Sequence, residues 1–121
     1  MNNGALLEYL RDVVPQLREQ GEMSEETADA LERIQAHVET VYNSYEAEEA
    51  PDGAETLRDL MLEALQLIYQ GVEELLVFGE ELDEEFLTTG LALVEEGHDV
   101  MNSIRHAVEQ DQSWTSSAAL G

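Results

Sequence analysis

Residues 27 to 45 carry a repeat of core-type side chains that constrains the fold more than any other feature of the chain. The repeat advances by alternating steps of four and three residues, through Thr27, Leu31, Ile34, Val38, Val41 and Tyr45. Such spacing places all members along one stripe of an α-helix, which is the seam expected of a coiled coil or helical bundle. The sequence therefore predicts a helix over about 24–48 that packs against other helices.

A second apolar stripe predicts a preceding helix over about 4–20. Pro15 lies inside this segment and is predicted to kink or briefly break it, because proline cannot donate to the carbonyl of the preceding turn. Gly21 supplies the left-handed residue that commonly ends a helix. Ser24, followed by two Glu, is predicted to cap the start of the next helix.

The segment beyond residue 50 predicts either two helices or one long one. Asp52 with Glu55 resembles a capping box and indicates a helix start near residue 53. Gly79, which is followed by acids, suggests a turn that separates helices at 53–78 and 81–110. The heptad phase also continues through this turn, so one helix over 53–110 is the alternative, and Gly90 is another candidate break. We favour the turn near Gly79, because it yields helices of similar length that can pack side by side.

Together these segments predict an all-α, up-and-down four-helix bundle. A chain of 121 residues suits a single domain, which we place at residues 1–110. Residues 111–121 show no helical stripe and are predicted to form a flexible C-terminal tail. Gly90 and Gly97 share one helix face, which predicts the close approach of another backbone.

The charge is strongly one-sided. The chain has 28 Asp and Glu against five basic residues, all Arg, which gives a formal net charge of −23. This surface repels nucleic acid and anionic membranes and attracts basic partners. No Cys is present, and no apolar run approaches the ~20 residues that a membrane span requires. We therefore expect a cytoplasmic protein that needs no cofactor and binds neither nucleic acid nor membrane directly.

Two groups of residues form the predicted partner-binding surface. The first is an acidic group that would steer a basic protein toward the chain: Glu80, Glu81, Asp83, Glu84 and Glu85. The second contains aromatic and aliphatic residues of the type that anchor interfaces: Tyr42, Tyr45, Leu67, Tyr69 and Trp114. Capping of the bundle end is the alternative role for Tyr45 and Trp114.

The leading functional hypothesis is a non-enzymatic binding module, such as an adaptor, chaperone or inhibitor, that engages a basic protein partner. It would act as a homodimer or in a complex with a helical partner. The first alternative is a nucleic-acid mimic that fills the cationic groove of a nuclease, restriction enzyme or CRISPR effector. Adaptation to a high-salt cytoplasm would explain the acidity without any partner. The sequence has no phosphate loop, nucleophile elbow or zinc spacing, so it predicts no enzyme.

A metal-binding bundle is the second alternative. Glu95 and His98 have the Glu-x-x-His spacing that carboxylate-bridged di-iron bundles use. If the chain turns near residue 80, Glu63 falls beside them. Only one such motif occurs, so a complete site would need a second copy of the chain. The competing interpretation is that a Glu-rich helix places Glu before His by chance and that both are solvated.

Overall fold

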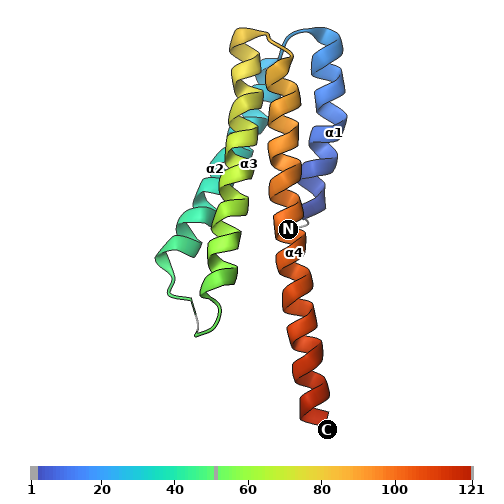
Figure 1. The fold of residues 1–121 in the computed structure, drawn as a ribbon. Helices are drawn as coiled ribbons and strands as arrows, with labels where there is room; N and C mark the ends of the chain where they lie inside the picture. The colour runs from blue at the N-terminus through green and yellow to red at the C-terminus, as the bar shows by residue number, and fades with distance from the viewer. Residues whose placement is uncertain (1–2, 51, 121) are drawn as a thin grey trace.

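The computed structural model describes residues 3–50 and 52–120, and the side chains of 5–50 and 52–108. The described residues form four helices: α1 (Asn3–Gln20), α2 (Glu25–Ala47), α3 (Glu55–Glu81) and α4 (Glu85–Leu120). They run alternately up and down, and no strand occurs among the described residues (Figure 1). The predicted all-α four-helix bundle is confirmed.

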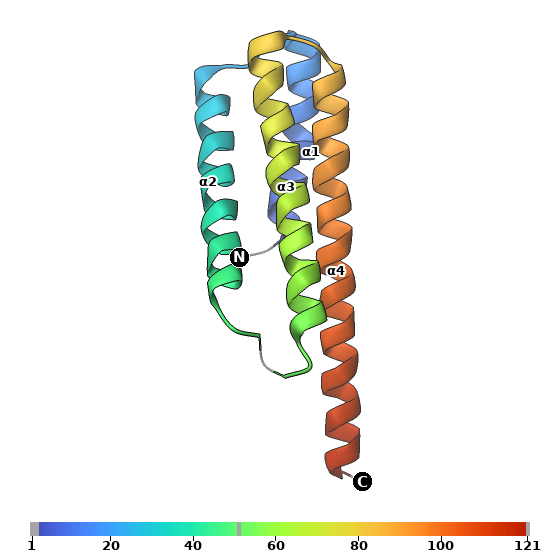
Figure 2. The ribbon, with the colours of Figure 1, turned by 60° about the vertical axis from the view of Figure 1, so that its left-hand side comes forward.

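The four helices are unequally packed. The backbone of α3 lies closest to that of α4, and α3 also packs against α2, while α1 packs against α4. Among the described residues, the backbones of α1 and α2 do not come close to each other. Figure 2 shows α2 at one side of the bundle, with α1 behind α3. The bundle is therefore closed on the α3–α4 side and open between α1 and α2.

Small residues bring α3 and α4 together. A Cβ atom added at Gly71 would lie 2.6 Å from the carbonyl oxygen of Gly90, and one added at Gly97 would lie 2.8 Å from the carbonyl oxygen of Ala64. No side chain fits at such distances, so these positions accept only glycine without a shift of backbone. The predicted role of Gly90 and Gly97 in close packing is confirmed.

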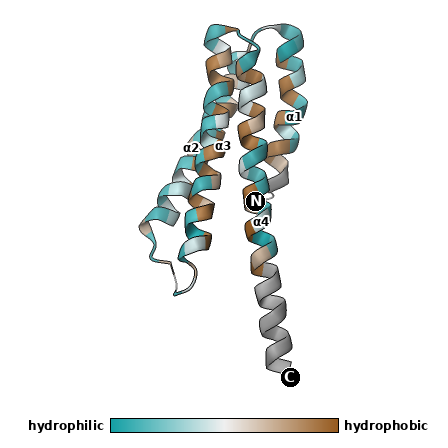
Figure 3. Ribbon diagram, viewed as in Figure 1, coloured by the Kyte–Doolittle hydropathy of each residue, from teal (hydrophilic) through white to brown (hydrophobic). Residues whose placement is uncertain are grey.

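The core is thick at one end of the bundle and thin at the other. The large cluster receives side chains from all four helices: Leu7, Leu10, Val14, Leu17, Leu31, Val72, Leu75, Phe78, Leu87 and Val94. A smaller cluster, of Val38, Leu65 and Ile68, continues it toward the α2–α3 loop. Figure 3 shows the hydrophobic residues recurring along α3 and α4. Helix α1 is the shortest of the helices in Figure 1 and contributes Leu6, a partly buried residue, to this smaller cluster.

The first two helix boundaries follow the sequence closely. Ser24 caps α2 by accepting a hydrogen bond of 3.2 Å from the backbone N–H of Thr27. Gly21 has a positive φ of 72° and its N–H donates to the carbonyl of Leu17. Helix α1 continues through Pro15, so the alternative of a short break there is wrong. The missing donor affects one hydrogen bond, and the buried stripe of α1 lies on both sides of it.

The boundaries around the α3–α4 turn differ from those predicted. Helix α3 continues past Gly79 to Glu81 and α4 begins at Glu85, so the predicted limits at 78 and 81 are wrong, as is one helix over 53–110. Leu82 ends α3 in the left-handed conformation, with φ 59°, and Asp83 then caps α4 by accepting from the N–H of Glu85 at 3.0 Å. Gly79 stays helical, and the side chain of Met23 lies beside it.

The start of α3 also lies later than predicted. The helix begins at Glu55 rather than near residue 53, and its N-cap, Ala54, makes no side-chain capping bond. The Glu55 carboxylate accepts a hydrogen bond of 3.1 Å from the N–H of Gly53. This bond reaches Gly53 and not the N–H of Asp52, so it is not the predicted capping-box bond, and Asp52 is exposed.

At the other end of the chain, α4 runs to Leu120, past the predicted end at 110, with no interruption at Gly90. Side chains from residue 109 onward lie outside those described. The tail assignment of 111–121 and the role of Trp114 therefore stay predictions. None of the described helices is both long and apolar enough to cross a membrane.

Candidate protein-docking groove

A groove runs along the open side of the bundle. It consists of three hollows that share wall residues: one between α1 and α2, a central one of about 260 Å³ bounded by all four helices, and one toward the α2–α3 loop. Leu6, His37 and Val38 belong to the first two, and Tyr45 and Met61 to the last two. We call these joined hollows the open groove. Its principal wall residues are Leu6, Tyr9, Ile34, His37, Val38, Val41, Tyr45, Met61, His98, Met101 and Ile104.

The groove exists because the apolar stripe of α2 has a close neighbour, α3, on only one of its edges. Leu31 and Val38 are buried, but Ile34 and Val41 are only half-buried and Tyr45 is 39% exposed. These residues belong to the repeat that predicted a packed helix. One edge of that stripe packs on α3, and the other faces the open side. Burial of such apolar surface against a partner removes it from water and stabilises the complex.

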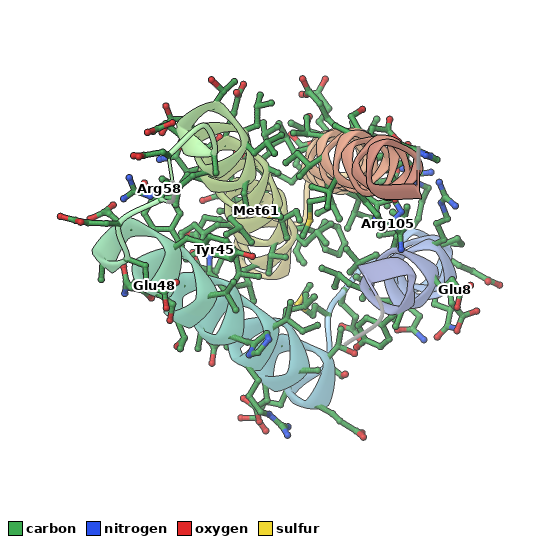
Figure 4. All side chains as sticks on the ribbon, turned by 90° about the horizontal axis from the view of Figure 1, so that it is seen from below. Glu8, Tyr45, Glu48, Arg58, Met61 and Arg105 are labelled. Carbon is green, nitrogen blue, oxygen red and sulfur yellow. The ribbon has the colours of Figure 1, made fainter. Side chains whose placement is uncertain are left out.

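The groove walls differ in charge from the rest of the molecule. No Asp or Glu lines the central hollow or the one between α1 and α2, within the part of the chain that the structure describes. Carboxylates appear only toward the α2–α3 loop, where Glu48 and Glu49 join Arg58. In the view along the bundle, Tyr45 and Met61 lie on the inner side, whereas Glu8 and Glu48 lie on the periphery among many oxygen-tipped side chains (Figure 4).

Three of the five arginines donate hydrogen bonds to uncharged oxygens. Arg58 caps the end of α2 by donating to the carbonyl oxygens of Tyr45 (2.9 Å) and Glu46 (2.6 Å). Arg18 donates to the Thr88 hydroxyl and Arg105 to the Asn102 side-chain oxygen. These contacts place cations on neutral oxygens rather than on carboxylates.

Nearly all of the carboxylates among the described side chains lack a partner of opposite charge. Among the described side chains one ion pair forms, between Arg11 Nε and Glu95 Oε1 at 3.6 Å, and both side chains are substantially exposed. The net charge of −23 is therefore spread over a surface that internal pairing barely neutralises. Such a surface produces a long-range negative potential.

The structure divides the predicted partner-binding residues among separate places. Tyr45 lies in the open groove, whereas Tyr42 and Tyr69 line another hollow, of about 460 Å³, between α2 and α3. That hollow, which we call the outer hollow, reaches the buried residues Val38 and Leu65, which also line the central one, but contains no residue of α1 or α4. Leu67 is half-buried and lines none of these hollows. The acidic group occupies the α3–α4 turn at the opposite end from Tyr45, and all five members are exposed: Glu80, Glu81, Asp83, Glu84 and Glu85.

The predicted metal ligands do not form a cluster. Glu63 is exposed, Glu95 pairs with Arg11, and His98 lines the open groove. No three His, Cys, Asp or Glu among the described residues are placed to hold a metal ion together. The metal hypothesis stays a prediction, and the arrangement of the described residues does not support it.

Sequence reasoning missed several walls of the groove, including Leu6, His37 and Met101. Their spacing resembles that of ordinary core residues, and nothing in the sequence states that α1 and α2 stand apart. The one available signal is His37, a titratable residue next to the apolar seam of α2.

Comparisons with protein-family models, curated proteins and solved structures found no match to this chain. The fold, the groove and the charge distribution together define an acidic, all-α four-helix bundle with one open side.

Proposed function

We propose that the protein is a non-enzymatic binding module, of the adaptor, chaperone or inhibitor type, that engages a basic protein partner. The observation that carries the proposal is the combination of a surface of unpaired carboxylates with an apolar groove free of acids along most of its length. Interfaces commonly combine an apolar centre with a polar surround.

The two features have separate physical roles. The negative potential accelerates the encounter with a cationic partner and weakens as salt screens it, over about 8–10 Å at physiological ionic strength. The groove supplies affinity through burial of apolar surface, which salt does not remove. The complex should therefore form quickly at low salt and dissociate at a rate set mainly by apolar contacts.

The test uses a basic protein library at low and high salt, with two variants of the chain. One carries amides in place of the acidic group at the α3–α4 turn: Glu80→Gln, Glu81→Gln, Asp83→Asn, Glu84→Gln and Glu85→Gln. The matched control carries five exposed amides elsewhere: Glu8→Gln, Asp12→Asn, Glu19→Gln, Glu32→Gln and Glu39→Gln. If the acidic group at the turn steers the partner, the first variant should associate with basic proteins more slowly than the control variant does. Equal slowing would assign steering to the total charge, and failure of any basic protein to bind at low salt would overturn the proposal.

A nucleic-acid mimic and a salt-adapted protein would each behave differently from such a binding module. A mimic would bind through carboxylates alone, so substitutions in the groove would leave its affinity unchanged. Adaptation to high salt predicts that the chain is unfolded at low salt and folds as salt is added. Circular dichroism with light scattering from low to molar salt tests this, and our proposal requires a folded bundle at the low-salt end.

A further inference from the structure

We propose that the open groove binds a single amphipathic α-helix whose outer face is basic. This inference deepens the proposed function and rests on it, because it identifies the site and the shape of the basic partner. A helix is the natural occupant of a position between α1 and α2, where a closed four-helix bundle would have direct packing.

The dimensions of the groove fit a short helix. Its walls follow α2 from Ile34 to Glu49, a distance of about 22 Å at 1.5 Å per residue, or about four helical turns. The apolar residues of α2 in this interval are spaced by three and four, which is typical of a helix that packs against other helices. Met61 and Met101, on α3 and α4, line the inner wall and can adapt to the side chains of an incoming helix.

The charges specify a cationic amphipathic helix and not a second copy of the chain. The acid-free walls accept an apolar face, while the side of the bound helix that remains in water faces a molecule of net charge −23. Lys and Arg on that side are attracted, whereas Asp and Glu are repelled. A second copy would bring another 23 negative charges to the same place, so self-association is opposed throughout the approach.

The ends of the groove also differ in charge and suggest a direction for the bound helix. Arg33 lies at the end between α1 and α2, whereas Glu48 and Glu49 lie at the end near the α2–α3 loop, where Arg58 donates to the carbonyl oxygens of Tyr45 and Glu46. The positive N-terminal end of a helix dipole is favoured beside the carboxylates and the negative C-terminal end beside Arg33. The bound helix should therefore run antiparallel to α2.

The probe is a fluorescent 18-residue Leu/Lys peptide designed to form an amphipathic helix, measured by fluorescence anisotropy on the full chain. The control peptide has the same composition with the Leu residues scattered so that no apolar face forms. Net charge is identical, so a difference between the two reports the shape of the occupant. We expect the amphipathic peptide to bind as one copy per chain and at least about tenfold more tightly, equivalent to about 1.4 kcal/mol.

Two tyrosines provide a matched pair of variants. Tyr45 lies in the open groove and is 39% exposed, and Tyr69 lies in the outer hollow and is 36% exposed. Tyr45→Glu and Tyr69→Glu make the same chemical change at similarly exposed positions. Added negative charge alone would strengthen binding of a cationic peptide. We expect Tyr45→Glu to weaken it by about tenfold or more, because a carboxylate enters the apolar contact, and Tyr69→Glu to change it by less than about twofold. Circular dichroism confirms that both variants remain folded.

Each remaining outcome contradicts the inference in a different way. If both peptides bind equally and Tyr45→Glu has no effect, the proposed function survives but the groove is not its site. If Tyr69→Glu is the damaging variant, the outer hollow is the site. If neither peptide binds at low salt, the proposed function fails as well. If light scattering shows a dimer that the peptide must dissociate in order to bind, a second copy occupies the groove.

Discussion

The α3–α4 seam and the α1–α2 side of this bundle are built from similar apolar stripes, yet one is closed and the other open. At the seam, Gly71, Gly90 and Gly97 let the two backbones nearly touch. On the other side, Leu6, Tyr9 and Ile34 line the hollow between α1 and α2, and the two backbones do not come close among the described residues. Periodicity determines which face of a helix is buried, whereas side-chain size determines how closely its neighbour approaches.

The difference separates stability from binding capacity. The closed seam continues into the large core, with Leu75, Phe78 and Leu87 fully buried. The apolar residues that line the open side, such as Ile34 and Val41, are only half-buried. Surface of this kind contributes less to folding and remains available to a partner. Substitutions at the seam should therefore lower the free energy of unfolding most. Substitutions of residues that attach α1 or α2 to the rest of the bundle should have smaller effects.

The largest effect is expected from Gly71→Ala. The new methyl group would lie 2.6 Å from the carbonyl oxygen of Gly90 and from a methyl carbon of Val94, so α3 and α4 must separate. Overpacking of this kind typically costs about 1–3 kcal/mol, and we expect a loss of about 2 kcal/mol or more because the obstacle is backbone. Urea denaturation followed by circular dichroism measures it.

Gly79→Ala is the matched control in the same helix. Its methyl group would meet the Met23 sulfur at 3.2 Å, and a flexible, half-buried methionine can move by a few tenths of an ångström. The higher helix propensity of alanine should then stabilise the chain by up to about 1 kcal/mol. Equal effects at both positions would show that the seam is not as tight as the geometry indicates.

The attachment of α2 is tested next by Arg58→Gln. Arg58 donates to two carbonyls at the end of α2, a helix whose last turn has no basic residue of its own. Its loss should cost about 1–2 kcal/mol, through the two hydrogen bonds and the interaction with the helix dipole. Arg105→Gln makes the same change in net charge but removes only a bond to Asn102 within α4. If both variants lose the same stability, the effect is due to charge and not to capping.

Much of this architecture can be predicted from sequence because its signals are local. Gly21 and Ser24 specify the α1–α2 turn through the conformation of one residue and the side-chain oxygen of the other. The pairing of Gly90 with Gly97 on one face also indicates a close approach. In each case the property of the residue that is visible in the sequence is also the property that acts in the structure.

The remaining features depend on contacts that are distant in sequence. Gly79 has the appearance of a helix end, but Met23 from the α1–α2 loop covers it and α3 continues. The heptad phase that the sequence suggests for α4 includes Gly90, Gly97 and Ile104, which are buried, but also Phe86 and Leu93, which are only half-buried. Leu87 and Val94, one position further along, are buried instead. Both pairs are apolar, so only the position of α3 distinguishes them. The open groove escapes sequence reasoning for the same reason, because periodicity does not reveal that a neighbour is absent.

The turn that joins the two helices of the seam provides a smaller effect, of opposite sign. Leu82 adopts a left-handed conformation with φ 59° and is 53% exposed. Leu82→Gly should relieve the steric cost and raise the free energy of unfolding by about 0.5–1 kcal/mol, after allowing for the greater freedom of glycine in the unfolded chain. Leu60→Gly, at a 37% exposed helical position in α3, should instead lose about 1 kcal/mol. Thermal denaturation compares the two, and a loss at Leu82 would mean that its side-chain contacts outweigh the strain.

The smallest effect concerns the attachment of α1 to α4. The Arg11–Glu95 pair is 3.6 Å long, and its side chains are 58% and 42% exposed. A double-mutant cycle with Arg11→Gln and Glu95→Gln should therefore give a coupling of at most about 0.5 kcal/mol, decreasing with salt. A small coupling would mean that the buried side chains of α1, such as Leu10 and Val14, hold the helix and fix one wall of the groove. A coupling above about 1 kcal/mol would assign that wall to the ion pair, and the groove would then change shape as salt screens it.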